Sequence, residues 1–144
     1  MASKAVSDAI EARIGSTWTG ADGIVLRVLA LNSNADARPA DGSPFIEVTY
    51  PVSNEQWLTI GSPGSNTFKE EGAFRVILNE SRAVGLARAS TWIDELRTLY
   101  RGVSLLSGAL QCFEAPPAAI NDANDLGNYY QFSFAVPYRY FFQG

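Results

Sequence analysis

The stretch that decides the fold lies near the end of the sequence, where residues 129–142 read YYQFSFAVPYRYFF. Every second residue from Tyr130 to Phe142 is a large apolar or aromatic side chain, and smaller or polar residues fill most positions between them. A period of two residues is typical of a β-strand that buries one face. The sequence therefore predicts a long final strand with one buried face.

Other strands are predicted upstream of this one. Residues 68–79, FKEEGAFRVILN, alternate in the same way, and EQWLTI at residues 55–60 begins as a strand. The Gly/Ser/Pro/Asn loop at residues 61–67 joins the two segments, which predicts a β-hairpin. FIEVTYPV at residues 45–52 predicts a short strand that ends at Pro51, because proline cannot donate a hydrogen bond to a sheet ladder.

Two segments have helical spacing. Apolar residues in SKAVSDAIEARI predict an amphipathic helix over about residues 4–14 that Gly15 stops. The stronger pattern covers residues 86–100, and Gly85 and Gly102 flank it. We expect this second helix to be the main helix of the fold.

The order of the elements indicates the fold class. GALQCFEAPPAAI at residues 108–120 predicts one more strand with a proline stop, whereas residues 24–34 fit a strand or a short helix. Residues 34–44 and 121–128 have the composition of a loop and a turn. We expect an α+β fold, with a mostly antiparallel sheet of about four to five strands and both helices packed on one face, in a single domain over residues 1–144.

The composition argues against several functional classes. The 144 residues include one cysteine and no histidine. The absence of histidine removes the commonest general base and the commonest metal ligand. Cys112 lies in an alternating apolar run, so we expect a buried thiol. The net charge of −4 argues against a nucleic-acid groove. Without a membrane-length apolar run or a secretory pattern, we expect no membrane association and a protein used in the cytoplasm or in a particle assembled there.

The carboxylate pairs do not form a catalytic pattern. Glu70 and Glu71 are neighbours in a predicted strand and would point to opposite faces. Asp94 and Glu95 would lie about 100° apart around a helix. The NDAND segment at residues 121–125 lacks the bend glycine and the distal glutamate of a calcium-binding EF-hand loop. No phosphate-binding glycine motif is present, so we predict a protein without enzymatic activity, cofactor or metal.

Two long segments carry a family resemblance. They are residues 59–102, with a Gly-rich loop followed by EEGAFRV and a helix that ends in LYRG, and residues 127–142, with NYYQFSFAVPYRY. Together with the short N-terminal helix, they resemble the tail terminator (tail-completion) proteins of long-tailed bacteriophages and gene transfer agents. Two features depart from the family pattern: residues 24–43 match weakly, and Tyr129 stands where tryptophan is common.

The resemblance implies a structural role without a reaction. Such proteins form a ring, usually a hexamer, that caps the head-proximal end of the tail tube, stops tube polymerisation and presents a surface to the head connector. The implied partners are copies of the chain, the tail tube protein and the connector protein, in the virion and, during assembly, in the host cytoplasm. Six copies at −4 each would carry −24, which suggests a lumen through which DNA passes without specific binding.

The end of the final strand is the first candidate interface. We expect residues 130–136 to pack on the main helix and the part beyond Pro137 to contact a neighbouring subunit, because interfaces are rich in aromatic residues and arginine. The alternative is a strand that is wholly internal, with a frayed end. The interface candidates here are Tyr138, Arg139, Tyr140, Phe141 and Phe142.

The other candidate residues each have a structural alternative. The loop with Ser62 and Asn66, next to Lys69 and Glu70, could order against the tail tube or be an ordinary solvent-exposed hairpin. Arg75 could contact another subunit or pair across strands within its own chain. The remaining candidates are Trp92, as an anchor or a core-edge residue, and Arg97 and Arg101, as contacts or a solvated helix end.

Two rival functions remain open from the sequence. One is another part of the same particle, such as a head-closure or neck protein or a small tube-like subunit. The other is a small non-enzymatic α+β binding module with no role in a virion.

Overall fold

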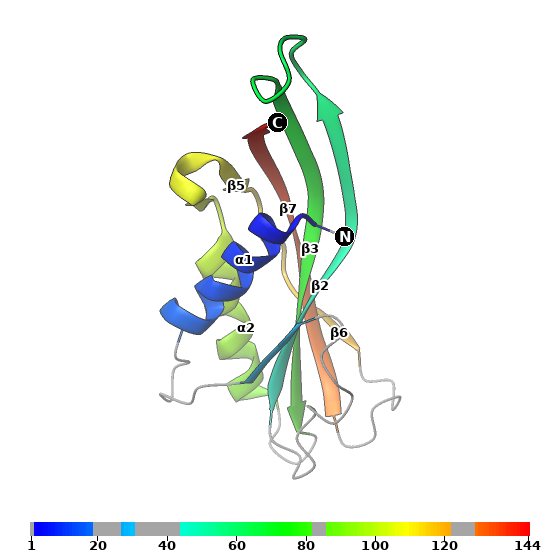
Figure 1. Ribbon diagram of the computed structural model, residues 1–144. Coiled ribbons are helices and arrows are strands. Elements are labelled where there is room, and N and C mark those ends of the chain that lie inside the picture. Colours follow the sequence, from blue (N-terminus) through cyan, green and yellow to red (C-terminus); the bar gives the residue numbers. More distant parts are fainter. Residues whose placement is uncertain (1, 19–26, 31–43, 82–85, 122–128) are drawn as a thin grey trace.

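The computed structural model describes residues 2–18, 27–30, 44–81, 86–121 and 129–144. A long twisted sheet forms one layer, and both helices lie against one of its faces (Figure 1). The elements are α1 (Lys4–Thr17), β1 (Arg27–Ala30), β2 (Phe45–Trp57), β3 (Thr67–Ser81), α2 (Ala87–Tyr100), β4 (Ser104–Leu105), the short turn η2 (Leu106–Gly108), β5 (Leu110–Cys112), β6 (Ala119–Asn121) and β7 (Tyr129–Gln143).

The sheet is mostly antiparallel, which confirms the expected α+β class. Its strand order is β1-β2-β3-β7-β5-β4, and β6 also pairs with β7. Among the described strands, only β1 and β2 pair in parallel. The described part of the chain holds seven strands, because β1, β4 and β6 add to the strands expected from the sequence. These three contain two to four residues each, which is too short for a period to be detected.

The prediction that a strand ends at Pro51 was wrong. A single strand, β2, runs from Phe45 through Pro51 to Trp57. Its register against β3 shifts between Thr49 and Val52, so a bulge accommodates the proline without a ladder hydrogen bond. Gly72 makes this bulge possible, since a Cβ added there would lie 2.1 Å from the carbonyl oxygen of Val52.

The first helix is longer than its sequence pattern predicted. Gly15 does not stop α1, which continues to Thr17. One glycine inside a helix costs only about 1 kcal/mol, and the burial of Ile14 and Trp18 at this end favours the helix. The second helix ends where expected, and Gly102 follows it with a φ of 65°. Gly85 and residues 122–128 lie outside the described residues.

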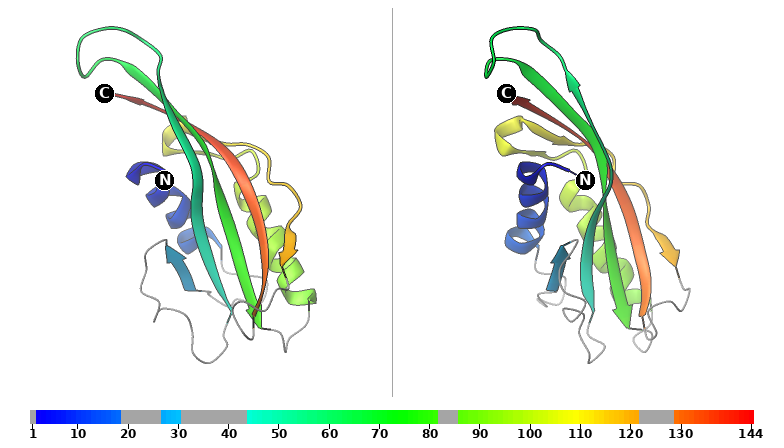
Figure 2. Two further views of the ribbon diagram at one scale, coloured as in Figure 1. Left: turned by 90° about the vertical axis from the view of Figure 1, so that its right-hand side faces the viewer. Right: turned by 45° about the vertical axis from the view of Figure 1, so that its right-hand side comes forward.

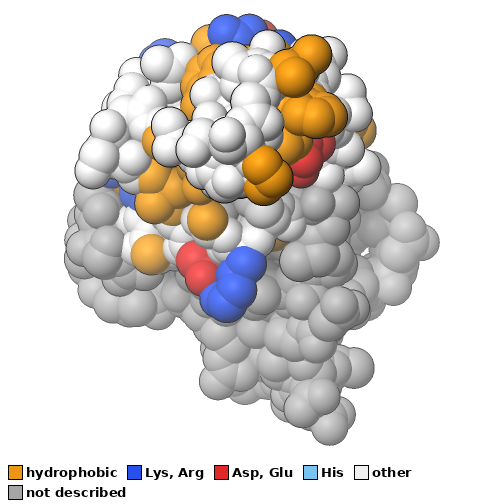
Figure 3. Space-filling view, turned by 45° about the horizontal axis from the view of Figure 1, so that its top comes forward, with side chains coloured by type: hydrophobic (Ala, Val, Ile, Leu, Met, Phe, Trp, Pro, Cys, Tyr) orange, Lys and Arg blue, Asp and Glu red, His pale blue; other side chains and the backbone are white. Residues whose placement is uncertain are grey.

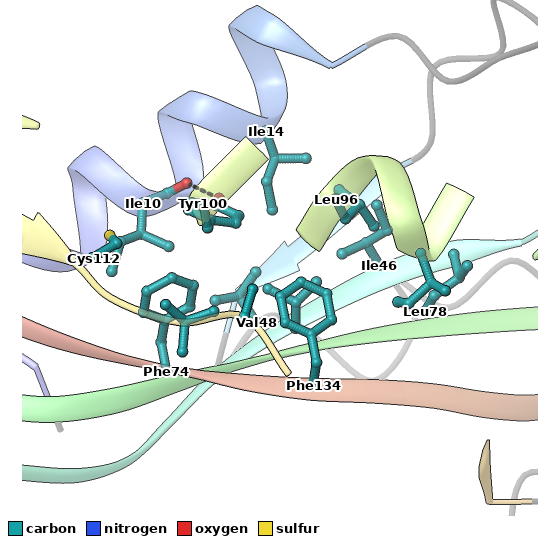
Figure 4. Packing of buried hydrophobic residues seen from close by; sticks show 14 of the residues in the cluster. Ile10, Ile14, Ile46, Val48, Phe74, Leu78, Leu96, Tyr100, Cys112 and Phe134 are labelled. Carbon is teal, nitrogen blue, oxygen red and sulfur yellow. Dashed lines mark hydrogen bonds between the residues drawn. The ribbon is translucent and has the colours of Figure 1, made fainter. Parts of the chain in front are cut away.

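The core fills the space between the two helices and the sheet. Figure 4 shows Ile10 and Ile14 of α1 and Leu96 and Tyr100 of α2 above a layer of sheet residues that includes Phe74. The Tyr100 hydroxyl donates a 2.6 Å hydrogen bond to the carbonyl of Ile10, which ties the two helices together. The expected burial of the final strand is confirmed for Phe132, Phe134 and Val136, and the expected burial of Cys112 is confirmed as well.

Part of the sheet extends beyond the helices. Figures 1 and 2 show the β2–β3 hairpin and the end of β7 projecting as a narrow extension past the helical layer. We call this extension the arm and define it as residues 52–73 and 137–144. The β2–β3 hairpin predicted from the sequence is confirmed, and β7 pairs with β3 along its whole length up to Gln143.

Candidate functional site

Four aromatic rings form a stacked row on the helix-facing side of the arm. Trp57, Phe68 and Phe142 lie on three neighbouring strands in direct cross-strand register. The ring centroids of Trp57 and Phe68 are 5.9 Å apart, and those of Phe68 and Phe142 are 5.6 Å apart. Tyr140 continues the stack at 5.4 Å from Phe142. We call these four residues the ring row.

The ring row continues the hydrophobic core but emerges from under the helices. Tyr138 follows it on the same face of β7, is buried, and lies 6.4 Å from Phe74 between ring centroids. Tyr140, Phe68 and Phe142 are half-buried, whereas Trp57 is 59% exposed. The row therefore has a rigid attachment at one end and an open aromatic surface at the other.

Further apolar side chains are exposed along the arm. Ile60 in the hairpin loop is 95% exposed, and Leu58 and Val52 are also exposed. With the arm end turned forward, hydrophobic side chains lie at the molecular surface among polar atoms (Figure 3). Exposed apolar groups gathered in one region mark an interaction surface more often than isolated ones do. Sequence reasoning did not select these residues; the signal was large apolar residues in a polar, turn-rich segment.

The hairpin loop is held by the candidate residue Asn66, which is buried. Its Nδ2 donates to the carbonyls of Gly61 and Ser62, at 3.4 Å and 3.2 Å. Its backbone exchanges two hydrogen bonds with Gly144, at 3.2 Å and 3.0 Å. Ser62 itself is exposed. These contacts join the loop to the end of β7, so the tip of the arm has a defined shape.

Glu70 is a buried carboxylate at the base of the arm. Its Oε1 accepts a 2.8 Å hydrogen bond from the Tyr138 hydroxyl and a 2.9 Å hydrogen bond from the backbone N–H of Ser3. Burial raises the pKa of Tyr138, and the hydrogen bond to Glu70 raises it further. The two candidate residues Glu70 and Tyr138 thus contact each other inside the chain.

The opposite face of the arm carries charged residues. The Glu71 carboxylate accepts a 2.9 Å hydrogen bond from Arg139 and lies 3.2 Å from the Lys69 ammonium group. The hydrogen bonds from Arg139 and then Lys69 lower the pKa of Glu71. The Arg139 guanidinium also lies over the ring of Phe113, 5.4 Å from its centroid. Phe141 shares this face and is half-buried.

Arg75 lies on the same face nearer the middle of the sheet. Its cross-strand neighbours are Thr49 and Ala135, and its side chain is exposed. Within the described ranges, no ion pair involves Arg75, so the alternative of a cross-strand ion pair is not seen.

The remaining candidates lie away from the arm. Trp92 is fully buried, packs edge-to-face with Trp18 at 6.4 Å, and lies under the Arg88 guanidinium. Arg97 donates to the carbonyl of Ala115 through Nε and Nη2, at 3.2 Å and 3.1 Å, and also pairs with a neighbouring aspartate on α2. Arg97 therefore fastens the segment after β5 to α2.

The comparison with known families decides the identity. A family model described as phage tail terminator protein matches residues 5–138. The chain belongs to the phage tail terminator family. The match confirms the resemblance drawn from the sequence and makes the chain a structural protein of the phage tail, a component of the virion that associates with other tail components. The comparison with curated proteins found no match.

The matched range covers most of this tail terminator. It includes both helices, the hairpin and Trp57 and Phe68 of the ring row. Residues 139–144, with Tyr140 and Phe142, lie beyond it. The arm therefore combines a part described by the family model with a segment outside the match.

Two properties of the described residues bear on metal binding and membrane insertion. Among the residues that the structure describes, no group of three or more carboxylate or cysteine side chains could hold a metal ion. In the same residues, neither helix has the length and apolar character needed to cross a membrane. The chain contains no histidine.

Proposed function

We propose that this tail terminator forms a ring that caps the head-proximal end of the tail tube, stops tube polymerisation and joins the tail to the head connector. The family match over residues 5–138 is the observation that carries the proposal. The ring is a hexamer of this chain, assembled in the host cytoplasm and retained in the virion.

The arm supports this proposal because it offers two kinds of contact. The ring row and the exposed Ile60 supply aromatic and apolar groups of the kind found at interface centres. The backbone at the sheet borders supplies hydrogen-bonding groups for a further strand. A tube end and a neighbouring subunit both require such surfaces, whereas a catalytic site requires converging polar groups in a cleft.

The charge supports passage of DNA without specific binding. Six copies at −4 each give the ring −24, and phosphates are repelled by a strongly acidic assembly. We expect the assembled ring to show no measurable retention of duplex DNA at about 50 mM salt, the condition that favours electrostatic binding. Retention comparable to that of a basic control protein would contradict this part of the proposal.

Tube length is the direct test of capping. Purified tail tube subunits that self-polymerise are mixed with increasing amounts of this protein, and tube lengths are measured by negative-stain electron microscopy. We expect the mean length to fall as the protein is added, with a ring-shaped cap at one end. An unchanged length distribution at saturating protein would reject the terminator function.

A loop variant separates the arm tip from the rest of the protein. Replacing residues 62–66 by a two-residue turn removes Asn66 and its contacts to the loop while keeping β2 and β3 joined. We expect the variant to fold and to cap tubes less efficiently. If the variant caps tubes at the same concentration as the wild-type protein, the tip only connects β2 to β3.

A further inference from the structure

At the level of Glu70 and Tyr140, where β5 and β4 join the sheet beside the arm, the sheet has two open borders. The strand order there is β2-β3-β7-β5-β4, with β2 at one border and β4 at the other. β1 pairs with β2 only up to Val48, and no other described strand pairs with the outer edge of residues 54–57. The outer edge of β4 is likewise without a strand in the part of the chain that the structure describes. Open strand edges are templates for pairing with another chain.

The two borders lie at the same level of the sheet. The cross-strand pairings form one continuous row from β2 to β4, and the neighbouring residue on each strand forms a second row. The first row is Glu55, Glu70, Tyr140, Leu110 and Leu105; the second is Asn54, Glu71, Arg139, Gln111 and Ser104. A copy placed beside another at equal height would therefore bring β4 next to β2.

The strand directions also fit. Each neighbouring pair from β2 to β4 is antiparallel, so β2 and β4, four strands apart, run in the same direction. Rotation about an axis that runs along the strands preserves this direction. We propose that β4 of one copy adds in parallel to the β2 edge of the next copy, and that this head-to-tail contact closes the ring. The inference rests on the ring proposed above and names the surfaces that form it.

The charges at the two borders are complementary. Glu55 faces Glu70 directly across the β2–β3 pair, and two like charges opposite each other are unfavourable. In the described residues, neither a lysine nor an arginine pairs with Glu55. Arg101, which is exposed and precedes β4, lies near the other border. Arg101 lies four residues before Leu105, the β4 residue in the row of Glu55, so a second copy would bring this cation to within about 13 Å of Glu55 along the strands.

Apolar side chains occur at both borders as well. Trp57 ends β2 and exposes the outer end of the ring row. Leu106 directly follows β4, is exposed, and has a φ of 52° in the left-handed region. That conformation costs a residue with a side chain about 1–2 kcal/mol. The head-to-tail contact would cover both side chains. Burial of Leu106 in this contact would offset the cost of its left-handed conformation.

Cross-linking across the two borders tests the contact. In a Cys112→Ala background, which removes the native thiol, Asn54→Cys and Ser104→Cys are combined in one chain and oxidised. The two positions are separated by four inter-strand steps of about 4.8 Å, too far for a disulfide within one chain. We expect a ladder of covalent oligomers larger than dimers, while either substitution alone in the same background gives little dimer. A double variant that forms no oligomers larger than dimers would overturn the proposal. Efficient dimer formation by Asn54→Cys alone would also overturn it, because it would indicate two-fold β2–β2 pairing.

A charge swap provides a second test that keeps the backbone unchanged. Glu55→Arg and Arg101→Glu should each weaken self-association by about threefold in sedimentation velocity at low salt, because each replaces an attraction across the contact by a repulsion. The double variant should recover wild-type association. Asp8→Arg on α1 makes the same change in charge at an exposed site and should have no effect. Two single variants that associate like wild type, or a double variant that shows no recovery, would contradict the contact.

The tests distinguish this inference from the proposed function. Sedimentation and cross-linking report contact between copies, whereas the tube-length assay reports capping. Normal capping without border cross-links would overturn only the head-to-tail pairing. Border cross-links without an effect on tube length would overturn the terminator function and retain the contact.

Discussion

The Tyr138 hydroxyl donates a 2.8 Å hydrogen bond to the buried carboxylate of Glu70. The two residues lie on neighbouring strands, and the same carboxylate oxygen accepts the backbone N–H of Ser3 just before α1. This carboxylate therefore joins β3, β7 and the start of the first helix at the point where the arm leaves the core. The position and stiffness of the arm depend on this junction.

Tyr138→Phe tests the junction. The substitution keeps the ring but leaves a buried carboxylate with one donor fewer, so we expect a loss of about 1–3 kcal/mol in the free energy of unfolding. Urea denaturation followed by tryptophan fluorescence provides the measurement. Tyr140→Phe, two residues further along the same face, is the matched control and should change stability by less than about 0.5 kcal/mol. Equal effects of both substitutions would show that the hydrogen bond to Glu70 does not stabilise the fold.

Gly72→Ala tests the bulge that accommodates Pro51. The added Cβ would lie 2.1 Å from the Val52 carbonyl oxygen, so the backbone of β2 must move. We expect destabilisation of about 1–3 kcal/mol or more, as for other overpacked sites. In Gly61→Ala the new methyl group meets only the side chain of Asn66, at 3.3 Å, and the effect should be much smaller. A neutral Gly72→Ala variant would refute the close approach of the two strands.

Asn66→Ala tests the order of the arm tip. The substitution removes the hydrogen bonds to the carbonyls of Gly61 and Ser62 and should cost about 1 kcal/mol. We expect faster amide hydrogen exchange in residues 58–67 and unchanged exchange in α2, measured by mass spectrometry. Ser65→Ala, at an exposed neighbouring position, serves as the control. Unchanged exchange at the tip would mean that other contacts hold the loop.

The pair of Glu80 and Arg88 should be essential for stability. The Glu80 side chain is fully buried, and Arg88 donates to both of its carboxylate oxygens, at 3.1 Å and 2.8 Å. Arg88→Ala leaves this buried charge without its cation, so we expect a loss of about 3–5 kcal/mol in thermal or urea unfolding. Adding Glu80→Gln to this variant should restore part of the stability. No recovery in the double variant would indicate that Arg88 acts mainly through its contact with the Trp92 ring.

Cys112 should resist alkylation and make stability depend on pH in the alkaline range. Burial raises the pKa of its thiol from 9.0 to about 11, so the folded state keeps a proton that the unfolded thiol loses. The resulting stabilisation is complete below pH 9 and is lost as the pH rises toward 11. Cys112→Ala should flatten the dependence of stability on pH between 9 and 10. Rapid reaction of the native thiol with iodoacetamide at pH 8 would contradict the burial.

The sequence alone was sufficient for the class of fold and for the family. The period of two in residues 129–142 predicted the final strand, and the helical spacing of residues 86–100 predicted α2 to within one residue at its start. Both signals are local, because a buried face imposes its period on the residues that form it. The motifs around the two segments were sufficient to indicate a tail terminator, which the family match confirms.

The tertiary structure decided which residues are available to a partner. Glu70, Tyr138 and Trp92 were interface candidates by residue type, yet each is buried among atoms of its own chain. Pro51 was expected to end a strand, but the close approach permitted by Gly72 on a different strand lets β2 continue and create the arm. Glu55 and Leu105 share one row only through the register of five strands. Burial and register depend on contacts between residues far apart in the chain, and local periodicity carries no information about them.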